Sequence, residues 1–297
     1  MTGQRSSRFI SHRYTLKTYS LTGEIIKALQ KERGAGHSTG FVPTMGALHE
    51  GHLSLISKSG KVNDITICSI FVNPFQFNNK QDFEKYPRNL DEDLRMLEAS
   101  GCDYVFVPEV NEIYPAGPVD LSIDFGSLDK VMEGKYRPGH FKGVASVVKK
   151  LFDIINPGCA YFGKKDYQQL LIIQRLVSFF RLPVKIIACP TLREPDGLAM
   201  SSRNLRLTIG EREAAPLIYD TLCKVKEKSG NAPVKEVKRW AIRRISSHPA
   251  FRVEYFEIVD KEDLSSLANW KTKGKALACT AIFLGDVRLI DNMELFS

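Results

Sequence analysis

Short apolar runs alternate with helix-like stretches over the first 190 residues, and this alternation constrains the fold more than any other feature. The runs that predict strands are residues 40–45, Asp64 to Val72, Asp103 to Pro108, Cys159 to Gly163 and Val184 to Leu192. Stretches with helical spacing of apolar residues separate them. Strands that alternate with helices predict right-handed crossovers and a mostly parallel sheet covered on both faces. We therefore expect an α/β fold built on a Rossmann-like parallel sheet.

The pattern changes after about residue 205. Charged helical sequence from Ile209 to Ser247 is followed by three β-like runs, "RVEYFEIVD", "ALACTAIFLG" and "VRLIDN". No helix-length spacer separates the last two, so this α+β pattern predicts an antiparallel sheet in a smaller second domain. With the linker near Cys189–Arg193, we expect a Rossmann-like domain over residues 1–190 and a smaller C-terminal domain over residues 191–297.

The net charge of +8 has two explanations: contact with nucleic acid or membrane, or a phosphate-rich small ligand beside ordinary solvated lysines. Much of the excess lies in residues 224–244, where acids are interleaved and aromatics are few. This spacing favours a solvated helix face over a nucleic-acid surface. We expect no nucleic-acid partner, and no membrane partner either, because no apolar run has membrane-spanning length.

Six cysteines are scattered without a CxxC pair, and most lie in apolar runs, where cysteine behaves as a small hydrophobe. We expect a reducing, cytoplasmic compartment, with no disulfide framework and no structural zinc site. The first fourteen residues contain arginines and serines but no acid. A frayed basic extension is favoured there over an organelle-targeting segment, for which the stretch is short.

The segment "PTMGALHEGH" follows the first predicted strand and places His49 and His52 three residues apart at the start of a helix. Helix spacing puts both rings on one face, and the free N–H groups of a helix start can hold phosphates. Histidine donates hydrogen bonds to phosphate oxygens and titrates near neutral pH. The alternative is a chance pair of core or surface histidines. A metal site is disfavoured because no third His or Cys ligand has suitable spacing.

The segment "FGKKDYQQ" again joins a strand end to a helix. Gly163 allows close backbone approach, and Lys164 or Lys165 can place an ammonium on phosphate. Asp166 can orient a ribose hydroxyl or a metal-bound water, and Gln169 offers an amide to a hydroxy acid. The alternative is a polar helix start with Asp166 as its N-cap.

Two further segments suggest ligand contacts. In "DGLAMSSRN", the hydroxyls of Ser201 and Ser202 and the guanidinium of Arg203 suit a polyphosphate, although an ordinary Ser/Asn turn is the alternative. In "SIFVNPFQFN", aromatics flank Gln76, which predicts a small pocket with one orienting amide. Simple packing at a strand end would explain the aromatics but explains Gln76 less well.

Six segments together resemble, in order, the motif set of the bacterial-type pantothenate synthetase family. They are "PTMGALHEGH", "SIFVNPFQF", "RPGHFKGV", "FGKKDYQQL", "DGLAMSSRN" and "LGDVRLIDN". The likeness covers about residues 14–297. It implies a nucleotidyltransferase-type Rossmann domain with an HxGH motif, a lid-like C-terminal domain, and a counterpart of the KMSKS loop at residues 200–203. It also implies that pantoate and β-alanine are joined with ATP through a pantoyl adenylate, releasing AMP and pyrophosphate.

The resemblance also implies roles for particular residues. ATP would be held by Met45, Gly46, Ala47, Leu48, His49, Glu50, Gly51, His52, Gly163, Lys164, Lys165, Asp166, Leu192, Met200, Ser201, Ser202 and Arg203. Pantoate or β-alanine would be held by Gln76, Gln169, Asn73, Arg137 and His140. The catalytic groups would be His52, His49, Lys165 and Arg203, with His52 in the family's acid role. One departure is Lys164, where the family usually carries Glu or Gln.

The resemblance further implies ATP used with Mg²⁺, no tightly held cofactor and a homodimer. Two other functions stay open on the sequence alone. Another HxGH nucleotidyltransferase would transfer its nucleotidyl group to a phosphate ester and would need a second cationic pocket. A nucleic-acid-binding protein would need a contiguous basic groove with stacking aromatics.

Overall fold

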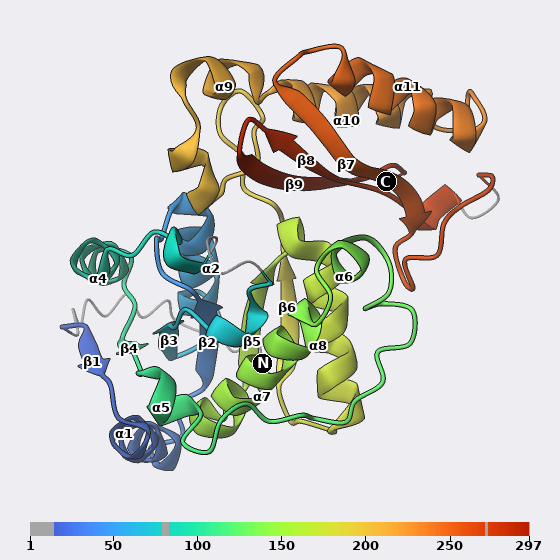
Figure 1. The fold of residues 1–297 in the computed structure, drawn as a ribbon. Coiled ribbons are helices and arrows are strands. Elements are labelled where there is room, and N and C mark those ends of the chain that lie inside the picture. The colour runs from blue at the N-terminus through green and yellow to red at the C-terminus, as the bar shows by residue number, and fades with distance from the viewer. Residues whose placement is uncertain (1–14, 79–82, 271–272, 297) are drawn as a thin grey trace, which may run out of the picture.

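The computed structural model describes residues 15–78, 83–270 and 273–296, so the basic stretch over residues 1–14 lies outside the described part. Within these residues the first half forms a parallel sheet in the order β1-β4-β3-β2-β5-β6 (Figure 1). Its strands are β1 (Lys17–Tyr19), β2 (Thr39–Thr44), β3 (Ile65–Ile70), β4 (Tyr104–Phe106), β5 (Cys159–Gly163) and β6 (Lys185–Cys189). The predicted α/β fold is confirmed, with β1 as an additional short edge strand.

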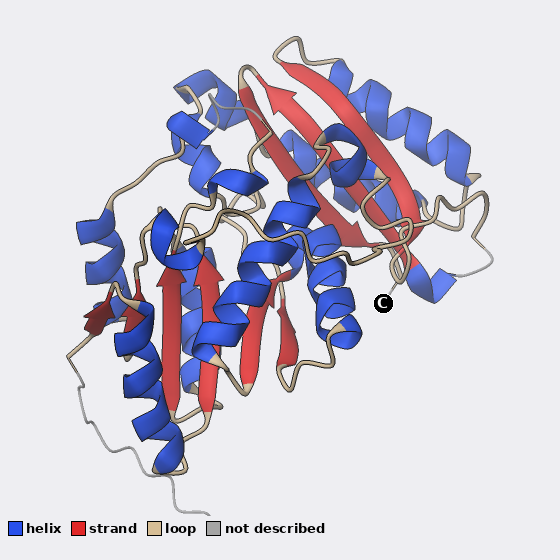
Figure 2. Cartoon of the chain, turned by 60° about the horizontal axis from the view of Figure 1, so that its bottom comes forward, coloured by secondary structure: helices blue, strands red, loops and turns tan. Residues whose placement is uncertain are grey.

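Helices cover both faces of this sheet, as Figure 2 shows. The helices of this half are α1 (Thr22–Gly34), α2 (Glu50–Gly60), α4 (Leu90–Ala99), α5 (Val110–Ile113), α6 (Met132–Tyr136), α7 (His140–Ile155) and α8 (Tyr167–Phe179), of which α6 packs on the C-terminal sheet instead. Successive strand residues point to opposite faces, so Phe41 packs with α1, α7 and α8, whereas its neighbour Val42 packs with α2 and α4. Burial on both faces explains why the strands are continuous apolar runs rather than alternating ones.

The chain reverses its winding direction at β2. Strands β3 and β4 lie on one side of β2, while β5 and β6 lie on the other. In doubly wound sheets this reversal opens a crevice at the carboxyl ends of the two strands that flank it. The segments that follow β2 and β5 therefore meet there, although they are more than 100 residues apart in the sequence.

The second half forms an antiparallel sheet in the order β7-β8-β9, as predicted. Its elements are α9 (Ile209–Ala214), α10 (Leu217–Lys228), α11 (Val234–Ser246), β7 (Phe251–Asp260), β8 (Ala276–Leu284) and β9 (Val287–Glu294). Helices α10 and α11 pack on one face of this sheet and complete a second hydrophobic core. The other face packs on α6 and α8 through a cluster that includes Met132, Leu171 and Leu277. The sheet therefore lies over the carboxyl-end region of the parallel sheet (Figure 1).

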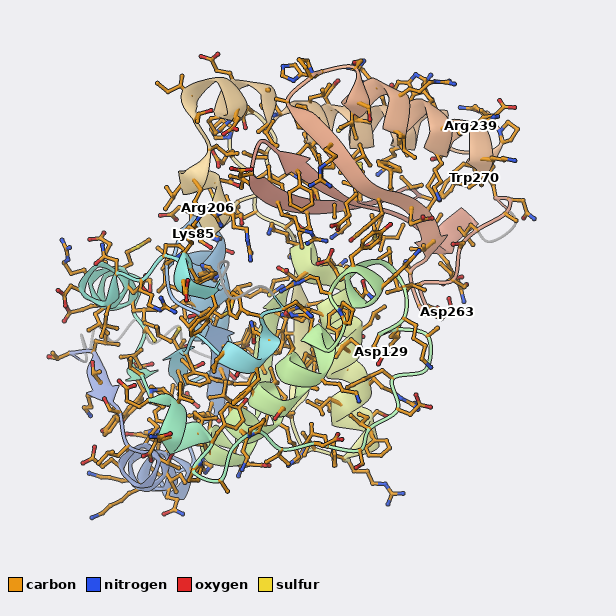
Figure 3. All side chains as sticks on the ribbon, in the orientation of Figure 1. Lys85, Asp129, Arg206, Arg239, Asp263 and Trp270 are labelled. Atoms are coloured by element: carbon orange, nitrogen blue, oxygen red, sulfur yellow. The ribbon has the colours of Figure 1, made fainter. Side chains whose placement is uncertain are left out.

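The basic stretch over residues 224–244 forms parts of α10 and α11. Its apolar side is buried at Val237 and Ala241, and Lys238 forms an ion pair with Glu257 of β7. Arg239 is exposed, and Figure 3 shows it on the outer side of the C-terminal layer. The pattern is that of an amphipathic helix with one packed and one solvated face.

Candidate active site

A cavity of about 220 Å³ lies where the carboxyl ends of β2 and β5 meet, at the reversal of the sheet. The structure brings most of the predicted site residues to its wall. They are Met45, His49, Gly51, His52, Gln76, Gly163, Lys165, Asp166, Gln169, Leu192, Met200, Ser201, Ser202 and Arg203. Elements far apart in sequence thus converge on one space, which is the arrangement that a ligand-binding site requires.

The turn after β2 adopts a backbone conformation that is set by a carboxylate from another helix. Gly46 and Ala47 have φ angles of +76° and +50°. Asp93 of α4 accepts hydrogen bonds from the main-chain N–H groups of Ala47 at 2.9 Å and Leu48 at 2.7 Å. A Cβ at Gly46 would lie 2.9 Å from an Asp93 oxygen, so glycine is required for both the angle and the space. Asp93 therefore fixes the path by which the chain enters α2.

The two histidines cap the start of α2 with their own rings. The Nδ1 atom of His49 accepts from the main-chain N–H of Gly51 at 3.1 Å, and the Nδ1 atom of His52 accepts from the main-chain N–H of His49 at 3.3 Å. A nitrogen that accepts a hydrogen bond carries no proton, so the ring hydrogen of each neutral histidine lies on Nε2. The capping contacts thus fix the tautomer and leave both Nε2–H groups as donors.

Burial holds both rings in the neutral form. Burial, with a smaller contribution from the charge of Lys165, lowers the pKa of His49 to about 4 and that of His52 to about 3. This corrects the expectation that these histidines titrate near neutral pH. In the free protein they are neutral hydrogen-bond donors, because desolvation penalises the imidazolium form.

The turn η2 (Lys164–Asp166) follows β5 and directs the side chains of its two adjacent lysines to different places. Lys165 lines the cavity, and no hydrogen-bond or ion-pair partner for its ammonium is found among the described residues. Lys164 instead turns to β9, where its Nζ lies 2.7 Å from an Oε atom of Glu294. Asp166 makes no side-chain cap hydrogen bond, so the alternative of a simple helix N-cap does not describe this turn.

The strand β9 also holds the backbone of this turn. The amide Nδ2 of Asn292 donates to the main-chain oxygens of Lys164 at 2.9 Å and Lys165 at 2.8 Å. Asn292 is buried, so these contacts are shielded from water. The C-terminal sheet therefore helps to fix the backbone position of Lys165, from which its side chain extends into the cavity.

The Ser-rich segment closes a third side of the cavity. The main-chain N–H of Met200 donates to the oxygen of Leu192 at 3.1 Å, which folds residues 192–200 back on themselves. Ser201 then caps the turn η3 (Ser202–Arg206) by accepting from the N–H of Arg203 at 3.3 Å. This is a local Ser turn, the alternative considered for this segment, and the same turn lines the cavity.

The remaining part of the cavity is mainly apolar with two amides. Gln76 is in the turn η1 (Pro74–Gln76), and buried Asn73 donates to its Oε1 atom at 3.3 Å. Apolar side chains line this end: Phe71, Val147, Val148 and Leu151. The aromatics that flank Gln76 pack elsewhere, Phe75 on Tyr114 and Phe77 on Phe83 and Tyr86. Gln76 lines the cavity, but the apolar side chains of the wall come from α7 and from Phe71, which directly follows β3.

Some predicted site residues do not line this cavity: Gly46, Ala47, Leu48, Glu50, Asn73, Arg137, His140 and Lys164. Arg137 and His140 lie along a smaller neighbouring cavity of about 40 Å³. It shares Lys165, Asp166 and Gln169 with the larger one. Lys164 is the clearest correction, because its ion pair with Glu294 takes its ammonium out of the cavity wall.

The chain is similar over nearly its whole length to one family of ligases. The Pantoate-beta-alanine ligase family model matches residues 17–294. The chain belongs to this family. The pantothenate synthetase of Azobacteroides pseudotrichonymphae is 49% identical over 271 residues, which cover 91% of this chain and 96% of that protein.

Solved structures of pantoate–β-alanine ligases share the fold. The pantothenate synthetase of Thermus thermophilus matches with a TM-score of 0.88 and 41% identity, covering 95% of this chain and 100% of that one. The Francisella tularensis ligase, crystallised with β-γ ATP and β-alanine, matches with a TM-score of 0.79 and 36% identity, covering 94% and 98%. The described residues contain no cluster of three or more His, Cys, Asp or Glu that could hold a metal ion. No described helix is long and apolar enough to cross a membrane.

The sequence alone did not single out three residues that shape the site. Asp93 is one of several acids in its helix, and nothing local distinguishes it. Tyr86 is buried, and its OH lies 3.5 Å from the Ser202 hydroxyl, 116 positions away. Asn292 lies in the segment "LGDVRLIDN", so the family resemblance pointed to its region but not to its role.

Replacing Asp93 with Asn is expected to raise the KM for ATP by about tenfold. The new NH₂ group would face one of the two main-chain N–H groups that the carboxylate now accepts, and a buried unsatisfied donor costs about 1–3 kcal/mol. Steady-state kinetics with varied ATP measures the effect. Asp91→Asn, an exposed position of the same helix, is the matched control. An unchanged KM for ATP in the Asp93→Asn protein would contradict the role given to this carboxylate.

Proposed function

We propose that the family reaction, the condensation of pantoate with β-alanine to pantothenate, proceeds in this cavity through a pantoyl adenylate. A pantoate carboxylate oxygen attacks the α-phosphorus of Mg-ATP, and the bond from this phosphorus to the bridging oxygen breaks to release pyrophosphate. The β-alanine nitrogen then attacks the acyl carbon, the bond to AMP breaks, and the amine loses its proton to solvent.

One observation carries the proposal: a single cavity joins a donor-rich end to an apolar end with two amides. The donor-rich end holds the ammonium of Lys165, the guanidinium of Arg203 and the Nε2–H groups of the two histidines. The apolar end, with Gln76 and Gln169, suits a small branched hydroxy acid.

The first step needs alignment and charge neutralisation rather than a base. A carboxylic acid with a pKa of roughly 4 is already ionised at neutral pH. Negative charge builds on the phosphate oxygens as pyrophosphate departs, and preorganised donors at those oxygens lower the barrier. Neutral histidines fit this role because they donate through Nε2 without first gaining a proton.

We also propose a division near residue 190, with residues 191–297 acting as a lid. An acyl adenylate is prone to hydrolysis, so a layer that excludes water protects it. The packing of β7, β8 and β9 over α6 and α8 supports this role, because it covers the edge where the cavity lies.

The proposal extends to the metal, the cellular location and the oligomeric state. Mg²⁺ would arrive on the ATP phosphates, since this metal often keeps waters and substrate phosphates as ligands instead of a protein cage. All six cysteines are free, which supports a reducing, cytoplasmic location. A homodimer is proposed from family membership, and sedimentation equilibrium tests it directly.

The decisive experiment measures pyrophosphate release from Mg-ATP with pantoate alone and then with β-alanine added. We expect a burst of one pyrophosphate per active site with pantoate alone, because the adenylate stays bound. Adding β-alanine should then give continuous AMP production. If neither addition released pyrophosphate, the acceptor assignment would fall, and an HxGH nucleotidyltransferase acting on a phosphate ester would be tested next.

A further inference from the structure

A bidentate ion pair joins the C-terminal sheet to the Rossmann-like half. Arg288 of β9 donates from Nη1 and Nη2 to the two carboxylate oxygens of Glu133 in α6, at 2.9 and 2.7 Å. Tyr255 of β7 donates its OH to Glu133 at 2.8 Å. Glu254 of β7 also accepts from Arg288, at 2.6 Å. Glu133 is only 7% exposed, so this contact is a buried part of the boundary between the two layers.

The polar contacts continue from Glu133 toward the substrate cavity. Arg137 lies 3.5 Å from Glu133 and 3.0 Å from Nε2 of His140. Arginine can only donate, so Nε2 of His140 accepts and its Nδ1 carries the hydrogen. That Nδ1–H donates to the main-chain oxygen of Gln76 at 2.7 Å. The chain of contacts ends on the residue whose amide lines the apolar end of the cavity.

The charges of Glu133 and His140 in this series of contacts do not change over the physiological pH range. Burial alone would raise the pKa of Glu133, but the hydrogen bonds and charge of Arg288 outweigh it and lower the pKa to about 2. Burial, together with the charge of Arg137, lowers the pKa of His140 to about 3. Glu133 therefore stays ionised while His140 stays neutral, so the direction of each hydrogen bond does not change near neutral pH.

The turn that bears Gln76 has little room to move independently of α7. A Cβ at Gly143 would lie 2.3 Å from the main-chain oxygen of Phe75. Asn73 reinforces this contact by donating to the Gly143 oxygen at 3.0 Å. A shift of His140 at the start of α7 would therefore be passed on to η1, because close-packed backbones move together.

We propose that Glu133 is a positioning residue that couples docking of the C-terminal sheet to the placement of Gln76. When Arg288 is bound to Glu133, the contacts from Glu133 through Arg137 to His140 are kept. The turn η1 then presents the Gln76 amide to the acid substrate. When the C-terminal sheet moves away, the Arg288–Glu133 ion pair is lost and the turn η1 with Gln76 is held less firmly. The inference rests on the proposed function only in taking Gln76 as a contact of the acid substrate.

The test compares Glu133→Gln and Arg288→Met with Glu257→Gln. Glu257 lies on β7 of the same sheet as Arg288, and its ion pair is with Lys238 of α11 rather than with α6, so it is the matched control. In the first two variants the KM for pantoate should rise about tenfold, the scale set by a buried hydrogen-bonding group left without its partner. The KM for ATP should change less than about twofold, because other residues line that end, whereas a general loss of structure would change both. The control should leave both constants unchanged.

Two results would overturn the inference. One is an unchanged KM for pantoate in both variants, and the other is a parallel rise in both KM values with a lower melting temperature, which would indicate a purely structural ion pair. If the single variants fail to fold, the double variant Glu133→Gln/Arg288→Met removes both charges together and is measured in the same way. Coupling also predicts that the double variant is no worse than either single one. A wild-type protein that releases no pyrophosphate with pantoate would refute the proposed function instead.

Discussion

Replacing Lys165 with Met is expected to slow pyrophosphate release from ATP and pantoate by about 100- to 1,000-fold. The ammonium of Lys165 faces the cavity without a partner among the described residues, so its charge is available to phosphate oxygens. Methionine keeps the length and apolar stem of lysine, so the packing of η2 should survive. Single-turnover pyrophosphate release isolates the first chemical step from product release.

The neighbouring residue supplies the control for this prediction. Lys164→Met removes the same charge one position earlier, but that ammonium pairs with Glu294, and the Lys164 side chain is about two-fifths exposed. Exposed ion pairs contribute about 0–1 kcal/mol, so the rate should stay within about threefold of wild type. Equal losses in both variants would mean that the turn itself, rather than the Lys165 charge, is what matters. A defect confined to Lys164→Met would reverse the assignment.

Replacing His52 with Ala is expected to lower the rate of adenylate formation by about 100-fold or more. The substitution removes the Nε2–H donor at the start of α2. It also removes the acceptor of the His49 main-chain N–H, and the loss of a capping contact costs about 1 kcal/mol. Two effects are therefore superimposed in this variant.

His52→Glu separates the two effects. Glutamate at the third position of a helix accepts from the N-cap residue in a capping box, so the stability of α2 should largely return. The ionised Glu side chain has no N–H to donate, so the rate should stay low. Urea unfolding and single-turnover rates measure the two quantities separately. A Glu variant with wild-type rates would show that His52 acts only as a cap.

Much of the fold could be predicted because each strand is encoded by a short continuous stretch of sequence. The run Cys159 to Gly163 matches β5 at both ends, since a buried parallel strand is a continuous apolar stretch. The run Val184 to Leu192 was predicted too long, because β6 ends at Cys189 and Pro190 has no N–H to continue the ladder. The edge strand β1 has only three residues, and its pairing with β4 leaves little local signature.

The site could be predicted in outline because its motifs follow strands whose carboxyl ends meet at one edge. The partners of those motifs could not, because they depend on contacts between distant segments. Asp93 acts on a turn 45 positions before it, and Asn292 acts on main-chain oxygens 127 and 128 positions before it. The direction of Lys164 could not be predicted either, because it depends on Glu294, 130 positions later.

The reversal of the sheet at β2 has a consequence for how the chain tolerates change. The residues of the site gather at the carboxyl ends of the parallel strands, so substitutions there can change the reaction. The amino ends of the same strands contribute to packing only. The exposed turn over residues 35–38 leads into β2 and lies at such an amino end. Insertions and sequence drift concentrate at such exposed turns. We therefore expect the amino edge of this sheet to accept insertions and sequence changes with less effect on the reaction than the carboxyl edge.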